Sequence, residues 1–436
     1  MAPKLRAVAP QLSLVAAMLL FAAFVGGTTG TSYAKKPPKR ALLDTVVVSN
    51  YGSAFAGSIE TFSAGAPRNS KPFLRITGTN TLLGIGTGPT GDAQSSLDGD
   101  IVVGVPLVLL PIGFPNGFVE VFSPGSNGNS EPKSLIGDPT GFDVTGVNLP
   151  QGVGFENPFD GVHPFGVDIL AVANTLPLVT APDLHIPELG LCAPNAPGFS
   201  LGTITEYDHE TLAPGLNVIP PFNDSPVNGG ANPATIGGCD TYLAGPVGLA
   251  FDAKGFLYAV NEGFVPTTSY VTVYEPGAHG NAIPIAIVGT GALVNPLYVA
   301  VASGPIMLVD GVPLPKDTIY VTDVGDNSIK IFAPFDPATC FTPALPFGCF
   351  GTQTGTISGG STKLKRPEGI ALSADGNLYV VNNNGNSLAE FADIAADLGG
   401  GDIAPTFMLP GVIGGKAPAM NFPVGVALPA FPPPPL

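Results

Sequence analysis

Short runs of hydrophobic residues, most of them four or five residues long, recur from residue 46 to residue 427. They are rich in β-branched and aromatic residues, and clusters of Gly, Asn, Asp and Pro separate them. This pattern predicts many short β-strands joined by tight turns. The segment Leu388–Leu398 also has apolar residues at helical spacing, but the register of the repeat described next predicts a strand for its first half.

Four kinds of segment recur in a fixed order, which indicates an internal repeat. In the clearest copy, Pro367–Phe391, a small apolar run (PEGIA) precedes an Asp-Gly turn, a strand ending in Asn (LYVVN) and a third strand (SLAEF). The strand that ends in Asn or Asp recurs at Val46–Asn50, Ile169–Asn174, Leu257–Asn261, Ile319–Asp323 and Leu378–Asn382, and more weakly at Ile101–Val103. The third strand recurs at Ile59–Phe62, Val119–Phe122, Ile204–Tyr207, Val271–Tyr274, Ile329–Phe332 and Leu388–Phe391.

The repeat predicts six antiparallel four-stranded units. Their innermost strands are expected near residues 84, 152, 248, 298, 369 and 425, where Gly and Ala permit close packing around an axis. The chain starts with a second-strand segment at Val46 and ends with an inner-strand segment at Gly425–Ala427. The last strand is therefore expected to complete the sheet begun by the first, which closes a six-bladed all-β propeller and removes exposed sheet edges.

The pattern of Pro367–Phe391 resembles the NHL-repeat family of β-propellers, and weaker copies extend the resemblance over nearly all of the chain after residue 34. The resemblance implies the fold. It does not select a function, because NHL-like propellers include binding scaffolds, lyases and lactonases.

The first residues have the order of a secretory signal peptide: basic residues Lys4 and Arg6, then the apolar run Leu12–Val25, then small residues up to Ala34. The apolar run is shorter than the ~20 residues that span a bilayer. We expect cleavage after Ala34 and a secreted or periplasmic protein, with an uncleaved anchor as the alternative.

The predicted domains are a signal peptide (1–34), a basic Pro-containing tail (35–44), one propeller (45–428) and a Pro-rich tail (429–436). Three segments depart from the repeat, at 104–117, 175–245 and 333–363. Long loops on a rigid scaffold are often functional, but these segments could equally be structural caps.

The charge balance excludes one class of partner. Residues 41–436 carry 11 basic side chains against all 33 acidic ones, a formal charge of about −22. Such a surface repels a phosphate backbone, so we expect no nucleic acid partner. The sequence leaves a protein, a glycan or a small molecule as the ligand.

Four cysteines in an exported chain suggest disulfides. We favour Cys192–Cys239 and Cys340–Cys349, because each pair falls within one of the departing segments. Metal binding is the rival, but the chain has neither a CxxC motif nor a histidine cluster beside a cysteine.

No catalytic motif stands out. The chain lacks GxSxG, HExxH and a Walker loop, and the GxGxxG match at Gly86–Gly91 has no helix after it, so it reads as a turn. His279 lies in a repeated turn. His185 and His209 could approach each other, but loop histidines are more often solvated, and we interpret them in that way. The DVGDN and NNNGN segments lack the ligand order of a calcium loop and are interpreted as turns.

Six-bladed metal-dependent lactonases, which the fold resembles, hold a divalent cation with carboxylate and amide ligands around the central channel. The residue before the inner glycine is Gln151, Val247, Glu368 or Val424, with Leu297 or Tyr298 in the divergent copy. One carboxylate is too few for a hard cation, so we assign no metal, no cofactor and no catalytic residue. Gln151, Tyr298 and Glu368 are the central-channel candidates for ligand binding.

The sequence therefore favours a secreted NHL-like propeller that acts as a binding or scaffold protein at or outside the cell envelope. The alternative is a propeller enzyme of the lyase or lactonase type, with its site at the central channel.

Overall fold

A computed structural model describes most of the repeat region of the chain. The chain divides into two compact units, Met1–Lys36 and Pro37–Leu436, and all described residues belong to the second. The described residues are 45–52, 57–64, 70–78, 93–95, 99–108, 115–137, 147, 149–156, 169–175, 202–208, 215–217, 235–237, 239–263, 269–302, 317–334, 349–373, 375–392, 399–410 and 420–428. No helix among them has the length and apolar character needed to cross a bilayer.

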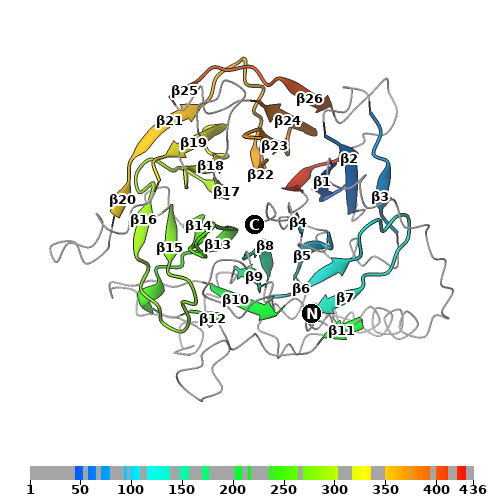
Figure 1. Cartoon of the computed structure of the whole chain (residues 1–436), viewed down its shortest axis with the longest axis horizontal. Coiled ribbons are helices and arrows are strands. Elements are labelled where there is room, and N and C mark those ends of the chain that lie inside the picture. Colours follow the sequence, from blue (N-terminus) through cyan, green and yellow to red (C-terminus); the bar gives the residue numbers. More distant parts are fainter. Residues whose placement is uncertain are drawn as a thin grey trace, which may run out of the picture. The chain divides into compact units, whose positions relative to one another are not determined.

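Six antiparallel sheets surround a common axis as blades of a propeller, so the predicted fold class and blade number are confirmed (Figure 1). From the axis outward, blade 1 contains β27 (Pro423–Ala427), β1 (Thr45–Asn50), β2 (Ser58–Ser63) and β3 (Leu74–Ile76). Blade 2 contains β4 (Ala93–Ser95), β5 (Ile101–Val108), β6 (Pro115–Phe122) and β7 (Ser134–Ile136). Blade 3 contains β8 (Pro150–Phe155), β9 (Ile169–Asn174), β10 (Thr203–Asp208) and β12 (Thr235–Ile236).

The second half of the ring repeats this order. Blade 4 contains β13 (Pro246–Phe251), β14 (Leu257–Asn261), β15 (Tyr270–Tyr274) and β16 (Ala286–Val288). Blade 5 contains β17 (Pro296–Val301), β18 (Ile319–Asp323), β19 (Ser328–Phe332) and β21 (Gln353–Ile357). Blade 6 contains β22 (Pro367–Leu372), β23 (Leu378–Asn382), β24 (Ser387–Phe391) and β26 (Phe407–Pro410). A short 3-10 helix, η5 (Cys239–Thr241), precedes β13.

The two ends of the repeat region meet in blade 1, as the sequence predicts. Strand β27 pairs antiparallel with β1, with Val47 opposite Ala427 and Val48 opposite Val426. The Ser49 hydroxyl oxygen also accepts a 2.9 Å hydrogen bond from the Gly425 N–H across this pair of strands. One blade is thus built from both ends of the propeller, which joins the first and last strands without a covalent link.

Glycines in the inner strands allow neighbouring blades to approach closely. A Cβ on Gly152 would stand 1.8 Å from the Val247 carbonyl oxygen, and one on Gly248 would stand 2.5 Å from that of Leu297. Real Cβ atoms do not come this close to a backbone oxygen. This contact between inner strands is the physical reason for the glycine in the repeated PxG motif.

The outer edges of the blades are covered by the blade that follows along the chain. The segment between the third and fourth strands of one blade pairs in parallel with the outermost strand of the blade before it. Three such segments are strands: β11 (Gly215–Asn217) on β7, β20 (Cys349–Gly351) on β16 and β25 (Gly400–Gly401) on β21. Two are single bridges, Ile76–Gly128 and Ile236–Gly280. These contacts protect edges that could otherwise pair with other chains.

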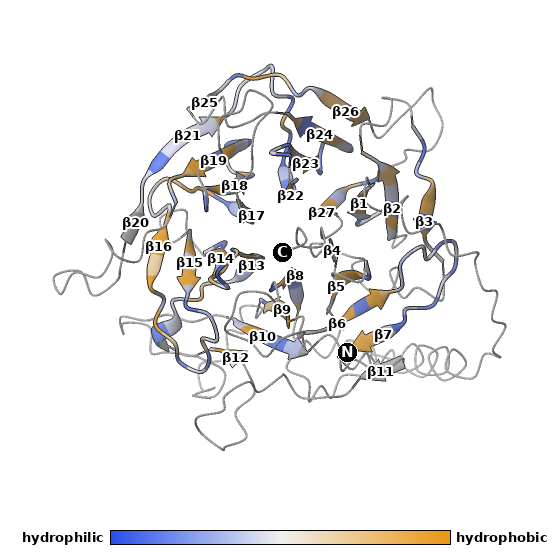
Figure 2. Cartoon of the chain, in the orientation of Figure 1, coloured by the Kyte–Doolittle hydropathy of each residue, from blue (hydrophilic) through white to orange (hydrophobic). Residues whose placement is uncertain are grey.

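The hydrophobic cores lie in the seams between blades. Figure 2 shows that hydrophobic residues are concentrated in the strands of the blades. Side chains of alternate residues in each strand face the blade on either side, so the second and third strands are buried on both faces, whereas outer strands such as β3 and β21 are partly exposed. The third strands, where the sequence predicts them, supply most of the largest buried rings, including Phe62, Phe122, Tyr207, Tyr274 and Phe332, while the second strands supply Tyr258 and Tyr320. Strand β24 confirms the strand interpretation of the first half of Leu388–Leu398.

The structure differs from the sequence expectation in two places. Strand β4, the inner strand of blade 2, spans Ala93–Ser95 and not the region of residue 84, which lies outside the described residues. Departing segments also supply regular fourth strands, since 333–363 contains β21 of blade 5 and 175–245 contains β12 of blade 3. Strands β4, β12 and β21 lack the PxG and IxxF patterns of the repeat, so their places in the sheets follow from their neighbours.

Candidate functional site

Five of the six inner strands begin with a proline, and they all begin on the same side of the ring. We call this side the proline face and define it by Pro150, Pro246, Pro296, Pro367 and Pro423. The turns between the second and third strands of each blade also lie there, because antiparallel strands alternate in direction. The candidate site is built from these two kinds of loop.

The Asn or Asp that closes each second strand holds the loop leading into the inner strand. Asn382 accepts a 2.9 Å hydrogen bond from the Lys365 N–H, and Asn261 accepts a 2.8 Å bond from the Ala244 N–H. Asp323 accepts from the N–H groups of Val294 and Asn295 at 2.7 and 2.9 Å. The recurring Asn or Asp at the end of the second strand therefore fixes the loops of the proline face by hydrogen bonds.

The residue before the inner proline adopts a left-handed conformation in several blades. Its φ is +49° at Leu149, +52° at Arg366 and +52° at Phe422. Residues before proline favour extended backbone, so this conformation is strained and needs support. The Asn327 side chain accepts a 2.6 Å hydrogen bond from the Arg366 N–H, and Asn386 accepts an equal one from Phe422. Each support comes from the preceding blade.

Glu368 is the buried acid of this face. It lies on β22, directly after Pro367, and only 4% of the residue is exposed. The Nε atom of Arg366 donates a 2.6 Å hydrogen bond to its Oε1, and the Asn383 side chain also hydrogen-bonds to it. Burial raises the pKa of Glu368 to about 7, although Arg366 and Asn383 oppose the rise.

Arg366 connects this acid with a second one and with solvent. Its side chain is 51% exposed, and its charge lowers the pKa of half-buried Glu262, which burial raises. Glu262 in turn contributes to the raised pKa of Glu368. Two carboxyl groups that hold protons more strongly than usual thus lie around one guanidinium group. Such an arrangement can bind a polar ligand or exchange a proton near neutral pH.

The three channel candidates from the sequence differ in their surroundings. Glu368 belongs to the cluster just described, and Gln151 is half-buried at the equivalent position of β8. Tyr298 occupies the register of the inner glycine, while Leu297 occupies that of Gln151 and Glu368. Tyr298 is 3% exposed and packs in the seam between blades 5 and 6. Its proposed contact with a ligand stays a prediction.

Sequence reasoning missed Arg366, Glu262 and Asn383. The signal for Arg366 was present, because Lys363, Lys365 and Arg366 place three basic residues within four positions of a strongly acidic chain. Glu262 and Asn383 each follow a second strand, a position that the repeat marks as a turn. The pairing of β22 with β23 places Asn383 beside Arg366, and the arrangement of the blades brings Glu262 of blade 4 close enough for the charge of Arg366 to lower its pKa.

Other candidates are turn residues or lie outside the described region. The Nδ1 atom of His279 is 2.9 Å from the Gly277 carbonyl oxygen within its own turn. Asp323 accepts the Gly325 N–H at 3.0 Å, and Asp326 contacts Lys330 and Ser328, so this segment is a turn. His163, His185 and His209, the segment Gly86–Gly91 and the side chains of Cys192, Cys239, Cys340 and Cys349 are not among the described parts. Within the described residues, no three His, Cys, Asp or Glu side chains gather as metal ligands would.

No known family profile matches the chain, and no curated protein matches its sequence. Among solved structures, a nidogen/laminin complex contains a similar chain: 13% identity, TM-score 0.47, covering 88% of this chain and 97% of that one. A protein from Lactobacillus plantarum is similar at 12% identity and TM-score 0.46, covering 88% and 98%. A protein from Bacteroides uniformis named as a candidate 6-phosphogluconolactonase is similar at 14% identity and TM-score 0.44, covering 84% and 82%. At these identities and scores, no function passes from these proteins to this chain.

Proposed function

We propose that this chain is an exported, NHL-like propeller that binds a partner on its proline face. The leader pattern ending at Ala34 supports export, and the repeat of Pro367–Phe391 supports the family. The observation that carries the binding role is the pair of buried Glu368 and half-exposed Arg366, held in a strained but well-supported loop. A strained residue fixed by its surroundings is typical of functional positions.

The binding role is tested by passing envelope material, separated into protein, glycan and small-molecule pools, over the immobilised protein and measuring which component it retains. Wild type and Lys71→Ala, which alters an exposed lysine next to β3, are expected to retain the same component. Arg366→Ala and Phe422→Ala, on the proline face, are expected to lose it. Equal retention by all four proteins would contradict binding on this face.

The pKa of Glu368 supports a second candidate function, a propeller enzyme at the channel. A carboxyl group with a pKa of about 7 can donate or accept a proton at neutral pH. With an aldonolactone as probe, a hydrolysis rate that changes around pH 7 and falls in Glu368→Gln would support this alternative. Metal analysis of the purified protein adds a second criterion, since a stoichiometric divalent ion would count against the purely binding role.

Export and the disulfides have direct tests. We propose cleavage after Ala34, which N-terminal sequencing of the exported protein would detect. We also propose the pairs Cys192–Cys239 and Cys340–Cys349. Peptide mapping without reduction is expected to give these two cross-links, and a Cys239–Cys340 link would overturn the pairing.

A further inference from the structure

We propose that the loop before β22 is a docking surface for an acidic, partly apolar peptide segment of a partner protein. This inference rests on the proposed binding role of the proline face and names the chemistry of the partner. The loop contains Lys363, Lys365 and Arg366, all of them exposed. They are three of only 11 basic residues in the strongly acidic region 41–436. We call these three residues the basic loop.

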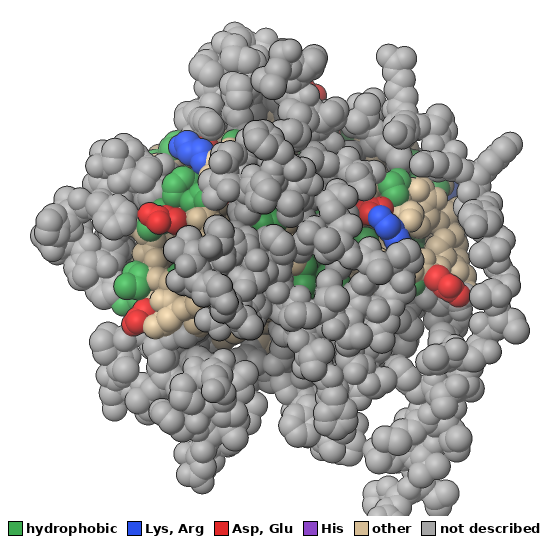
Figure 3. All heavy atoms as spheres, turned by 60° about the horizontal axis from the view of Figure 1, so that its bottom comes forward, with side chains coloured by type: hydrophobic (Ala, Val, Ile, Leu, Met, Phe, Trp, Pro, Cys, Tyr) green, Lys and Arg blue, Asp and Glu red, His purple; other side chains and the backbone are tan. Residues whose placement is uncertain are grey.

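Most other described basic side chains already have an acidic partner. Lys133 pairs with Asp100 at 2.7 Å, and Lys254 pairs with Asp317 at 3.1 Å. On the face drawn in Figure 3, visible basic side chains likewise lie beside acidic ones. In the basic loop, by contrast, the described residues provide no ion pair for Lys363 or Lys365, and Lys363 Nζ donates only to the Gly360 carbonyl at 2.9 Å. Their charge is available to a partner.

Arg366 also retains donors for a ligand. Glu368 engages its Nε, and the other guanidinium nitrogens have no hydrogen bond to a described residue. A guanidinium group carries five N–H donors and binds carboxylates with particular geometric fit. Because Glu368 and Glu262 keep raised pKa values, they compete less strongly for this cation than two ionised carboxylates would.

The basic loop is held in one shape from several sides. Leu364 points into the seam between blades 5 and 6 and is 8% exposed, which turns its two lysine neighbours outward. Asn382 accepts the Lys365 N–H, and Asp402 of the next blade accepts the Ser361 N–H at 2.6 Å. Such a loop loses little conformational freedom when a partner binds, which favours affinity.

Apolar side chains on either side of the basic loop favour a peptide over a purely charged polymer. Only four large hydrophobic residues are notably exposed among the described ones, and two of them, Val294 and Phe422, lie in the loops before β17 and β27. These blades flank blade 6 in the ring. The face therefore presents apolar, basic and apolar surface in succession, which fits a segment with acidic residues between apolar ones.

The test measures binding of a fluorescein-labelled 12-residue peptide that alternates Glu with Leu and Phe. Wild type and Lys71→Glu, the matched charge reversal away from the proline face, are expected to bind it equally, and more weakly as salt increases. The double variant Lys363→Glu/Lys365→Glu is expected to bind at least ~10-fold more weakly, since two attractive charges become repulsive. Circular dichroism and thermal unfolding show whether each variant folds, and Phe422→Ser provides a second, uncharged probe with an expected loss of ~3-fold or more.

Each other outcome counts against the inference. Equal binding by wild type and the double variant would overturn the role of the basic loop. Tighter binding of polygalacturonate than of the peptide would replace the peptide with an acidic glycan. Absence of peptide binding, while Arg366→Ala still abolishes retention of an envelope component, would overturn the acidic peptide and leave the proposed function standing. If the peptide does not bind and Arg366→Ala retains the envelope component as wild type does, the proposed function is overturned as well.

Discussion

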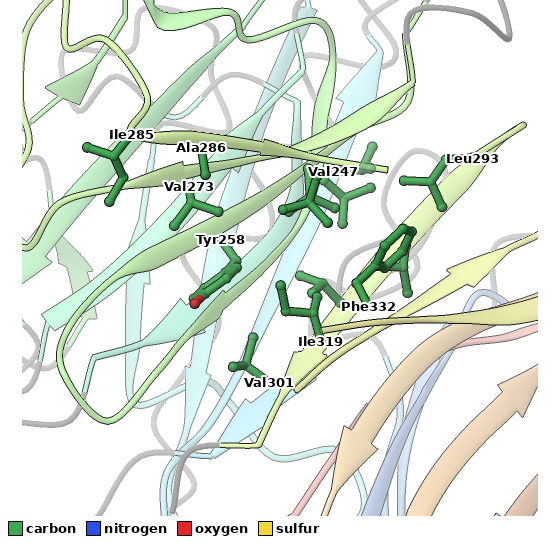
Figure 4. Close-up of a cluster of buried hydrophobic side chains, with 14 residues drawn as sticks. Val247, Tyr258, Val273, Ile285, Ala286, Leu293, Val301, Ile319 and Phe332 are labelled. Carbon is green, nitrogen blue, oxygen red and sulfur yellow. The ribbon is translucent and has the colours of Figure 1, made fainter. Parts of the chain in front are cut away.

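The seam between blades 4 and 5 and the seams on either side of blade 1 use the same strands in different ways. Between blades 4 and 5, apolar side chains such as Val273, Ile319 and Phe332 interdigitate (Figure 4). The one hydroxyl in this cluster, that of Tyr258, donates to Asp252 at 3.4 Å. No member of this cluster carries a carboxyl group; the buried acids Asp252 and Asp317 lie beside it, and Lys254 pairs with Asp317.

Both seams of blade 1 contain buried acids on third strands. Glu60 shares the face of Val48, toward blade 6, and Glu390 of blade 6 lies in the same seam beside Tyr379. Glu120 lies opposite Val103, in the seam of blades 1 and 2. Arg75 Nε is 3.2 Å from Glu60 Oε1 without hydrogen-bond geometry, and neither oxygen of Glu120 has a hydrogen-bond partner.

Burial raises the pKa of all three acids, to about 8 for Glu60 and well above its usual range for Glu120. At neutral pH Glu60 is therefore largely uncharged, and burial favours the uncharged form of Glu120 and Glu390 as well. The seams differ in the surroundings of their acids: the carboxyl oxygens of Glu60 and Glu120 accept no hydrogen bond, whereas Asp252, beside the seam of blades 4 and 5, accepts the N–H groups of Lys254 and Phe256. Glu60 and Glu120 bind protons on folding, so the seams of blade 1 contribute to the pH dependence of stability.

The largest expected effect comes from opening blade 1. A chain that ends at Asn421 lacks β27, so β1 loses its inner partner and the seam loses Val426. We expect no cooperative thermal unfolding of this chain, because an open ring exposes inner edges and apolar seams. A chain that ends at Leu428 is the control and should unfold like the full protein. A cooperative transition within a few degrees in both would contradict closure as the main source of stability.

The second effect tests the apolar seam. Phe332→Ala removes a fully buried ring and should lower the free energy of unfolding by about 3–5 kcal/mol. Phe332→Leu, which retains much of the volume, should lower it less. Because the Phe332 ring carries no titratable group, urea unfolding should give the same difference at pH 5 and pH 7. A difference that changes with pH would show that the two kinds of seam are coupled.

The third effect tests the proton uptake of blade 1. Glu60 titrates near 4.5 when unfolded and near 8 when folded, so the folded state holds an extra proton between these values. Its contribution to stability is complete below pH 4.5 and decreases by about 1.4 kcal/mol per pH unit up to pH 8. Urea unfolding from pH 5 to pH 7 should therefore show a flatter pH dependence, by about 2–3 kcal/mol in total, for Glu60→Gln than for wild type.

Glu120→Gln provides an independent check in the other seam and should flatten the pH dependence in the same direction, because Glu120 also binds a proton on folding. Glu275→Gln, at an exposed position outside the seams, is the control with an unchanged slope. An unchanged slope in both seam variants would mean that these acids are already ionised in the folded protein, and the comparison between the seams would fail.

The sequence predicted the parts of this fold that depend on local pattern. The PxG segments, the strands ending in Asn and the third strands fall in register because each repeat has the same turn chemistry, and closure followed from the order of segments at the two ends. The inner strand at Ala93–Ser95 was not predicted, because nothing in Ala-Gln-Ser distinguishes a strand from a turn. The parallel strand β25 consists of two glycines and exists only because β21 is beside it.

The candidate site could be predicted only in part, because contacts between segments far apart in the chain leave no local pattern in the sequence. Glu368 was singled out because it occupies the position before the inner glycine of the repeat. Its partner Arg366 occupies a left-handed conformation that no propensity favours before a proline and that Asn327 of the neighbouring blade sustains. The seam acids escaped notice because Glu60, Glu120 and Glu390 look like ordinary solvent-facing residues in an alternating strand. Blades on both sides bury them.

The smallest expected effect concerns the cation beside Glu60. Arg75 lowers the pKa of Glu60, but its side chain is half-exposed and its ion pair is screened by solvent. Arg75→Ala should therefore cost less than about 1 kcal/mol, and only where Glu60 is charged. Urea unfolding should give nearly equal stabilities for variant and wild type at pH 6 and a lower one for the variant at pH 9. Lys71→Ala, four residues earlier, controls for the loss of a positive charge. An equal loss at both pH values would mean that Arg75 acts through the packing of its side chain and not through the charge of Glu60.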